Sequence, residues 1–294
     1  MKKILVIGKN SFIGVAFAAW LARWPEDYEV DLVSYRNMGT EVRSLLGYDV
    51  VFNVAGMITQ QRALDVVYES FNRDLAIKVA EIAKNEGVGM MIQLSSTAVY
   101  GAKAGIGKNN QIESSTRILP TSVYGRSKLE AEQGIAAYID EGFKACFIRT
   151  PTVYGPHCKG SYVYLRKLAL RFGVVPDIPN RRSLIYVGNL CEYVRLIIDR
   201  GIDGIVSPCD KEPFCTSEVM EWIAAENGQS MQRSRLLRII LLPLMFVIPH
   251  LRRAFGNLTT DPDLSQMPLE DYCLWSSRAA IKETEASFRM RESI

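Results

Sequence analysis

A tyrosine and a lysine stand four residues apart in the segment SVYGRSK, residues 122–128. Pro120 and Thr121 indicate a helix start, so Tyr124 and Lys128 are expected one turn apart on one helix face, with side chains about 5–6 Å apart. A free tyrosine has a pKa of about 10 and is a poor base at neutral pH. A nearby ammonium favours the phenolate and lowers that pKa. The spacing therefore favours an acid–base catalyst, although the same pattern also occurs on solvated helix faces.

Polar residues end two apolar runs of the sequence. The segment LSSTAVYG, residues 94–101, ends a predicted strand with hydroxyl groups, and NVAG, residues 53–56, ends another in the same way. In open α/β sheets, ligands bind at the carboxyl ends of the strands. Both segments therefore favour a catalytic role for Tyr124 over a solvated helix face.

The first apolar run leads into a loop with two glycines. Gly8 allows a tight turn between strand and helix, and Gly14 allows the helix to pack closely on the strand. The N-terminus of the following helix offers free N–H groups to a diphosphate. Ser11 stands where a middle glycine is frequent, and its hydroxyl could donate to a phosphate. The loop predicts a dinucleotide site, with a plain turn and helix cap as the alternative.

The first half of the chain alternates apolar runs with helical patterns. Strands are predicted at residues 3–7, 29–34, 50–54, 90–95 and 144–149, and helices at residues 12–24, 64–85 and 122–140. Continuously apolar strands that alternate with helices are typical of a parallel sheet covered on both faces. Proline and glycine cluster after Tyr154, where a smaller lobe is expected to begin. The predicted fold class is α/β: a doubly wound parallel sheet of Rossmann type with a smaller C-terminal α/β substrate lobe.

Composition narrows the class of function. The chain is 48% hydrophobic and 23% charged, as in a soluble globular enzyme, and its net charge of +3 without a Lys/Arg block argues against nucleic acid. Two histidines and six cysteines without a C-x-x-C pair argue against a metal site and indicate reduced thiols. The N-terminal apolar run stops at Gly8 without a cleavage site, so a cytoplasmic protein is expected.

One later segment, LLRIILLPLMFVIPH at residues 236–250, is strongly apolar. Pro243 is expected to break it, and arginines flank it on both sides. A transmembrane helix needs about 20 apolar residues, so no transmembrane span is predicted. A packed helix pair of the C-terminal lobe is favoured, with a peripheral membrane or partner contact as the alternative.

In their order along residues 1–205, the motifs resemble the extended short-chain dehydrogenase/reductases, specifically the nucleotide-sugar epimerase/dehydratase group. The resemblance rests on Gly8-x-x-x-x-x-Gly14, Asn53-Val-Ala-Gly56, Asn72, Ser95-Ser96-Thr-Ala-Val-Tyr-Gly101, Tyr124-Gly-Arg-Ser-Lys128, Arg149-Thr-Pro-Thr-Val-Tyr-Gly-Pro156 and Arg182-Ser-Leu-Ile-Tyr-Val-Gly-Asn-Leu190.

The resemblance implies roles for individual residues. Ser96 matches the catalytic hydroxyl, Tyr124 the acid–base tyrosine, and Lys128 the lysine that holds the ribose and lowers the tyrosine pKa. Arg182 matches an arginine that binds the diphosphate of a sugar nucleotide, while Thr152 stands where many members have asparagine. The residues expected at the cofactor are Gly8, Ser11, Phe12, Ile13, Gly14, Ser34, Arg36, Val54, Ala55, Gly56, Asn72, Lys128 and Pro151. Those expected at the substrate, a nucleotide-diphosphate sugar, are Thr97, Thr152 and Arg182.

The resemblance also implies a domain plan and an assembly. A dinucleotide-binding domain is expected at residues 1–157, with residues 182–205 returning to it, and a substrate-binding lobe at residues 158–181 and 206–294. The helices at residues 64–85 and 122–140 would pair with their copies in a homodimer, unless their apolar stripes only face the sheet.

The resemblance leaves three reactions of the group to consider for this chain: dehydration, epimerisation and reduction of a keto sugar. The dehydratases of the group carry Asp-Glu just after the catalytic hydroxyl, where this chain has Thr97 and Ala98, so elimination of water is disfavoured. Epimerisation through a 4-keto sugar, as in a UDP-hexose 4-epimerase, is favoured. NADP-dependent reduction of a 4-keto sugar is the alternative, and a non-catalytic dinucleotide-binding sensor is less favoured because Tyr124 and Lys128 are both present.

The expected cofactor is NAD(P), with NADP favoured. NAD-specific proteins place a carboxylate at the end of the second strand to accept from the ribose 2′-hydroxyl. Here that position is Ser34, followed by Tyr35 and Arg36, and Asp31 lies inside the strand. Arg36 and Ser34 would instead suit a 2′-phosphate.

Overall fold

A computed structural model describes residues 1–34, 44–56 and 69–292 of the chain. The chain divides into two compact units. Unit 1 comprises Met1–Gly101, Arg117–Thr150 and Cys191–Ser207, and unit 2 comprises Ala102–Thr116, Pro151–Leu190 and Pro208–Ile294. The segment Ala102–Thr116 belongs to unit 2, whereas the expected dinucleotide-binding domain at residues 1–157 includes it. Each unit is described by itself below.

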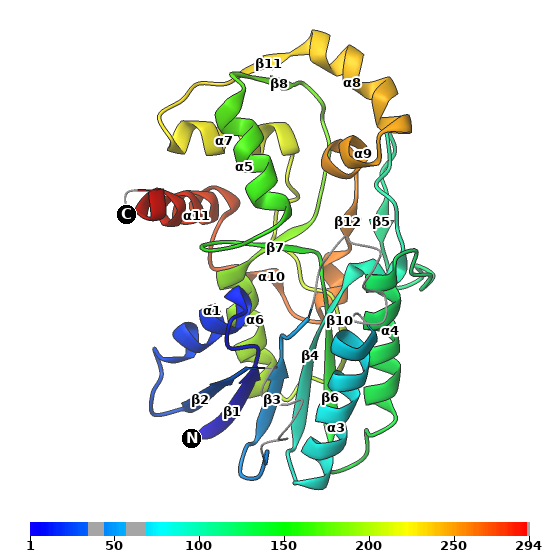
Figure 1. The fold of residues 1–294 in the computed structure, drawn as a ribbon, viewed down its shortest axis with the longest axis vertical. Helices are drawn as coiled ribbons and strands as arrows, with labels where there is room; N and C mark the ends of the chain where they lie inside the picture. Colours follow the sequence, from blue (N-terminus) through cyan, green and yellow to red (C-terminus); the bar gives the residue numbers. More distant parts are fainter. Residues whose placement is uncertain (35–43, 57–68, 293–294) are drawn as a thin grey trace. The chain divides into compact units, whose positions relative to one another are not determined.

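Unit 1 is built on a parallel sheet of six strands (Figure 1). The strands are β1 (Lys2–Ile7), β2 (Tyr28–Val33), β3 (Val50–Asn53), β4 (Met90–Ser96), β6 (Lys144–Thr150) and β10 (Gly204–Val206). Their order across the sheet is β10-β6-β4-β3-β1-β2, and every pair is parallel. The chain leaves β1 toward β2 and returns to β3 on the other side, so the strand order reverses at β1. This arrangement confirms the predicted doubly wound α/β fold, and such reversal points hold ligands at the strand carboxyl ends.

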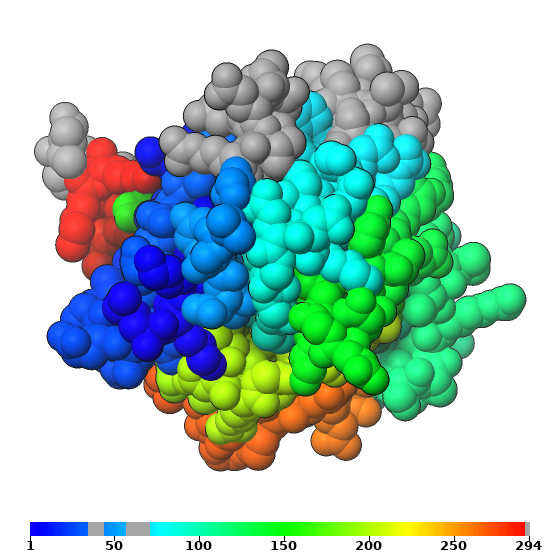
Figure 2. Space-filling view, turned by 90° about the horizontal axis from the view of Figure 1, so that it is seen from below, coloured from blue at the N-terminus to red at the C-terminus, as the bar shows by residue number. Residues whose placement is uncertain are grey.

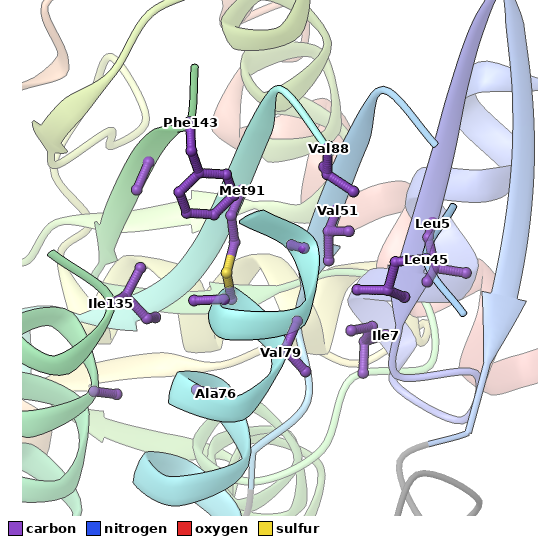
Figure 3. Packing of buried hydrophobic residues seen from close by; sticks show 14 of the residues in the cluster. Leu5, Ile7, Leu45, Val51, Ala76, Val79, Val88, Met91, Ile135 and Phe143 are labelled. Atoms are coloured by element: carbon purple, nitrogen blue, oxygen red, sulfur yellow. The ribbon is translucent and has the colours of Figure 1, made fainter. Parts of the chain in front are cut away.

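Helices pack on both faces of this sheet. On one face α3 (Leu75–Asn85) and α4 (Val123–Ala136) bury apolar side chains against alternate strand residues. Figure 3 shows Val79 and Ile135 in one apolar cluster with Val51 and Met91. On the other face lies α1 (Phe12–Leu21), and its Phe17 ring meets Phe52 edge-on at 5.0 Å. The apolar strands are therefore covered on both sides, as their composition predicts.

A π-helical turn, η3 (Glu69–Asp74), precedes α3. The sequence predicts a long helix at residues 64–85, of which residues 64–68 lie outside the described part. The described residues 69–85 are helical, but the first turn is π-helical and the α-helix begins at Leu75. A π-helical turn is wider than an α-helical one and is frequent at functional sites. Figure 2 shows the surface of α3 (cyan) beside that of α4 (green).

Among the described residues, unit 2 contains short parallel strand pairs, seven α-helices of which α6 belongs to it only in part, and the 3-10 helix η5 (Pro262–Ser265). The strand pairs are β7 (Thr152–Tyr154) with β9 (Leu184–Tyr186), β8 (Val174–Pro176) with β11 (Gln232–Ser234), and β5 (Gln111–Ile112) with β12 (Thr259–Thr260). The α-helices are α5 (Ser161–Arg171), α7 (Thr216–Glu226), α8 (Arg235–Val247), α9 (Pro249–Phe255), α10 (Leu269–Tyr272), α11 (Ser277–Glu292) and the start of α6 (Val187–Arg200). A buried ion pair joins α5 to α11, with Arg166 Nε 2.8 Å from Glu285.

The apolar segment at residues 236–250 differs from its expected structure in two ways. Helix α8 continues through Pro243, and the helical run breaks only at Ile248, before α9. Pro243 has no N–H to donate to the carbonyl oxygen of Ile239. Because Ile239 is exposed, water can donate to that carbonyl in place of the missing N–H. The pair of helices is present, but most of the apolar side chains of α8 are exposed rather than packed. Among the described residues, no helix combines the length and hydropathy needed to cross a membrane.

Candidate active site

The glycine loop after β1 has the shape that its residues predict. Gly8 has a φ of 134°, in the region that favours glycine, and a Cβ built on it would lie 2.7 Å from Val54 Cγ2. A Cβ on Gly14 would lie 2.9 Å from the Gly8 carbonyl oxygen. The loop, the helix and the end of β3 therefore approach too closely for any side chain. Ser11 is the N-cap of α1 and makes no side-chain capping hydrogen bond.

The first turn of α4 packs on the segment that follows β4. Ser122 caps the helix, and its hydroxyl accepts from the Gly125 N–H at 3.0 Å. A Cβ on Gly125 would lie 2.5 Å from the Ala98 carbonyl oxygen, so only glycine allows this approach. The contact brings the turn that carries Tyr124 against η4 (Thr97–Tyr100), directly after Ser96.

Ser96 ends β4 and starts that short helix. Its hydroxyl is half-buried and accepts from the Ala98 N–H at 3.2 Å, which caps η4. Thr97 is also half-buried. The two hydroxyls thus lie at the carboxyl end of a central strand, where ligands bind in such sheets.

Lys128 is buried within unit 1, with only 4% of its surface exposed. Its Nζ donates to the carbonyl oxygen of Leu94 at 2.9 Å and lies beside Gly56 and Asn72. Asn72 in turn donates to the Ser127 hydroxyl at 3.3 Å. Burial lowers the pKa of Lys128 to about 8, against a smaller opposite effect of Glu132. The ammonium is therefore still mostly present at neutral pH, one helical turn from Tyr124.

A buried ion pair that sequence reasoning missed lies behind the lysine. Glu132, one turn after Lys128, accepts from Arg149 Nη2 at 2.6 Å and from its Nε at 3.1 Å. Ser95 also donates to Glu132, and Arg149 donates to the Tyr100 hydroxyl at 3.1 Å. The network links α4 to β4, η4 and β6. Its only sequence signal is the position of Glu132 on the same helix face as Tyr124 and Lys128.

Unit 2 contains two of the three residues expected at the substrate, Thr152 and Arg182. Thr152 is exposed on β7, where it is paired with Leu184 of β9. Arg182 makes backbone bridges to Phe214 and Leu258, and its Nη1 donates to the Gly256 carbonyl oxygen at 3.2 Å. Burial, and then the charge of Arg253, lower the pKa of Arg182 to about 10. Among residues 1–34, 44–56 and 69–292, no ion pair involves Arg182.

The sequence does not predict a site role for Arg253. The feature that could have indicated one is the pair of arginines, Arg252 and Arg253, just after the apolar segment at residues 236–250. Arg182 is half-buried and Arg253 is exposed, and their two positive charges repel each other within unit 2. An anion between them would relieve that repulsion, and arginine suits phosphate in particular. Arg182 and Arg253 together form an electropositive place in unit 2.

Asp210 is a second residue of unit 2 that the sequence did not indicate. Its carboxylate accepts from Asn189 Nδ2 at 2.8 Å, from Tyr154 Oη at 3.1 Å and from the Tyr186 N–H at 3.0 Å. Burial raises its pKa to about 6, and these hydrogen bonds lower it by less. Asn189 therefore holds the junction of β9 and α6 through Asp210.

The remaining candidates divide by location. Ser34, at the end of β2, is half-buried, and Pro151 is the half-buried first residue of a segment of unit 2. Phe12, Ile13, Val54 and Ala55 lie in unit 1 at the glycine loop and at the end of β3. Arg36 lies outside the described residues. The structure thus brings together Gly8, Gly14 and Val54 as one group, and Gly56, Asn72 and Lys128 as another.

These features define a dinucleotide-binding α/β protein of the Rossmann class. The sequence matches the profile of the NAD dependent epimerase/dehydratase family over residues 4–206. The chain belongs to that family.

Three known proteins illustrate the likeness. The chain is 28% identical over 166 residues to a UDP-glucose 4-epimerase of Vibrio cholerae, which covers 54% of this chain and 49% of that protein. It is 27% identical over 211 residues to an N-acetyl-alpha-D-glucosaminyl-diphospho-ditrans,octacis-undecaprenol 4-epimerase of Escherichia coli O157:H7, covering 65% of this chain and 62% of that protein. The chain thus spans about half to three fifths of these relatives.

A solved structure extends the likeness in fold. The UDP-glucuronic acid 4-epimerase of Bacillus cereus in complex with NAD superposes with a TM-score of 0.76 at 18% identity, over 98% of this chain and 99% of that one. At that identity the match supports the fold, including the part of the chain beyond residue 206.

Proposed function

We propose that this protein is a nucleotide-sugar 4-epimerase that works through a 4-keto sugar. The observation that carries the proposal is the buried ammonium of Lys128 at the carboxyl end of β4, one helical turn after Tyr124. This arrangement supplies the cation that a tyrosine needs to act as a base near neutral pH. The named 4-epimerases among the relatives support the same reaction.

The proton is handled by residues of unit 1. Tyr124 takes the proton of the sugar 4-hydroxyl, and Ser96 hydrogen-bonds the same oxygen. Lys128 stabilises the phenolate that this transfer requires. After rotation of the keto sugar, Tyr124 returns the proton to the oxygen; with a hydride on the opposite face of the carbon, which a bound nicotinamide would supply, this gives the epimer. Thr97 and Ala98 offer no proton shuttle, so the keto sugar keeps its 6-hydroxyl.

The close-packed glycines fit a dinucleotide. The cradle at Gly8 and Gly14 would be filled by any Cβ, and Gly56 leaves the same kind of opening beside Lys128 and Asn72. A bound nicotinamide would supply the hydride acceptor and donor for the sugar carbon. Ser11, Phe12 and Ile13 would hold the diphosphate by the N-terminus of α1, and Lys128 would hold the ribose.

The diphosphate of the substrate is assigned to unit 2. Arg182 and Arg253 present two guanidinium groups whose mutual repulsion an anion would relieve. Thr152 is the further expected contact. This assignment predicts that Arg182→Met raises KM for a nucleotide sugar far more than it lowers kcat.

Reduction of a 4-keto sugar with NADPH is the second candidate, because it needs the same residues. A reductase would use them for one transfer of hydride and proton, whereas an epimerase uses them for two. It depends on NADP, which Ser34 and Arg36 favour over NAD. Titration of both cofactors into wild type and Arg36→Ala tests this preference. Equal affinity of wild type for NAD and NADP, or no selective loss of NADP in the variant, refutes it.

A screen of UDP-, GDP- and dTDP-sugars separates the two candidates. An epimerase interconverts a 4-epimer pair with catalytic amounts of cofactor, whereas a reductase consumes NADPH in proportion to a keto sugar. A protein that binds dinucleotide without either activity would contradict both, and would restore the non-catalytic sensor.

Two further expectations complete the proposal. We infer a homodimer through α3 and α4, carried by Leu129 and by Ile139, which is 43% exposed just after α4. Light scattering that gives a concentration-independent monomer mass would contradict it.

We also infer a cytoplasmic compartment, because all six cysteines are unpaired thiols.

A further inference from the structure

Helix α8 turns its apolar side chains outward within unit 2. Met245 faces inward and is 1% exposed, whereas Ile239 and Val247 are 68% and 78% exposed. The exposed side chains recur at helical spacing, so they share the face opposite Met245. We call this face the α8 apolar stripe, and its members are Leu236, Ile239, Ile240, Leu244, Phe246 and Val247. Single exposed apolar residues are ordinary, but a contiguous set marks an interaction surface.

The charge around the stripe is one-sided. Residues 227–260 contain five arginines and neither aspartate nor glutamate, while the whole chain has a net charge of only +3. Arg235 and Arg238 are exposed on α8 itself, and neither forms an ion pair among the described residues. Arg233, just before the helix, is neutralised by Glu221 at 2.6 Å. Helix α8 therefore has one apolar face, with Arg235 at its edge and Arg238 on the opposite face, seven residues before Met245.

This charge distribution indicates what kind of partner binds the α8 apolar stripe. A second copy on the same face would bring no acidic side chain to these arginines, because a two-fold interface repeats the same surface and residues 227–260 contain neither aspartate nor glutamate. Like charges across an interface oppose association. An anionic lipid surface instead complements both features, because phosphates attract the arginines and the acyl boundary takes the apolar side chains.

We propose that α8 binds this protein reversibly to an anionic lipid bilayer. The α8 apolar stripe lies in the boundary between headgroups and acyl chains, and Arg235 and Arg238 contact lipid phosphates. Pro243 limits the depth, because the Ile239 carbonyl has no helical donor and needs water. The helix spans 13 residues, short of the roughly 20 that cross a bilayer, so it lies along the surface.

Vesicle flotation of the full chain tests the proposal. Wild type is expected to float with phosphatidylcholine vesicles that contain phosphatidylglycerol, and much less with phosphatidylcholine alone. The variant Ile239→Ser/Phe246→Ser should lower the partition coefficient by about tenfold or more, because it removes two inserted apolar groups. The variant Arg235→Gln/Arg238→Gln should lose the preference for anionic vesicles and its sensitivity to salt.

A matched control is Leu46→Ser/Leu274→Ser, since these side chains are 74% and 53% exposed outside α8. It should float as wild type does. Absence of wild-type flotation, or an equal loss in the control, overturns the proposal. So does a serine variant of α8 that keeps vesicle binding but changes the molecular mass by light scattering, which would assign the stripe to a second protein chain.

Discussion

Helix α4 buries polar and charged side chains, whereas helix α8 exposes apolar ones. Ser127, Lys128 and Glu132 of α4 are each less than 5% exposed, and Phe246 and Val247 of α8 are each more than 70% exposed. Both patterns are unfavourable for an isolated fold, because one removes charge from water and the other leaves apolar surface in it. On α4 the compensation is internal, through hydrogen bonds and a counter-charge. On α8 it has to come from outside the described chain.

The largest effect is expected at the tyrosine of α4. Tyr124→Phe should lower turnover by about 10²–10⁴-fold, because the variant keeps the ring and loses the group that moves the proton. Cofactor affinity should be retained, which a fluorescence titration checks. Tyr138→Phe, at a half-buried tyrosine just after α4, is the matched control and should keep full turnover. Wild-type turnover in Tyr124→Phe would refute the mechanism.

The buried ion pair of α4 should govern stability. Glu132→Gln leaves Arg149 buried without its counter-charge and should lower the free energy of unfolding by about 3–5 kcal/mol. Glu130→Gln on the same helix is the control, since Glu130 is 41% exposed and pairs with Arg73 at 3.1 Å. Its loss should be under about 1 kcal/mol. Urea unfolding measures the free energy of unfolding of the two variants. Equal decreases in the two would contradict the expected difference between the buried and the exposed ion pair.

The lysine of α4 should make stability depend on pH. The pKa of Lys128 is about 8 in the folded chain, below its ordinary value of 10.5, so between these values the unfolded chain binds more protons. Stability from this group therefore rises with pH over that window, by about 3 kcal/mol in total. Because cysteines and tyrosines also titrate there, the measurement is the difference between wild type and Lys128→Met. A difference that does not change from pH 8 to pH 10.5 would contradict the burial of the ammonium.

The smallest effect is expected on α8. Ile240→Ala removes a side chain that is 48% exposed and should change the free energy of unfolding by no more than about 0.5 kcal/mol. Ile135→Ala on α4 removes a fully buried side chain of the same type and should lose about 2–5 kcal/mol. Thermal unfolding measures both. A large loss at Ile240 would mean that α8 packs on its own chain.

The sequence predicts well what depends on local spacing. Gly8, Gly14 and the helix that carries Tyr124 and Lys128 follow from turn chemistry and helix geometry, and the structure has each of them. The strand alternation likewise predicts the parallel sheet. Each of these features is decided within a few residues.

What depends on distant partners was not predicted. Glu132 meets Arg149 only because α4 packs on β6, and Asp210 finds its donors on Tyr154 and Asn189 through the fold of unit 2. An apolar run such as α8 has the same composition whether it packs on a core or on another surface, so sequence alone favoured packing. The helix break was also misplaced, because an exposed carbonyl tolerates Pro243.

The division of the chain has a consequence for how such proteins can be recombined. Each unit consists of three separate stretches, so the chain passes between the units five times. No single crossover in the gene can exchange one unit for that of a relative, since each half of a cut chain would carry fragments of both. Exchange of unit 2 by recombination would require three coordinated replacements, at residues 102–116, 151–190 and 208–294. Gradual substitution within unit 2 is therefore the simpler evolutionary route to a changed unit 2, and the more promising one for laboratory evolution.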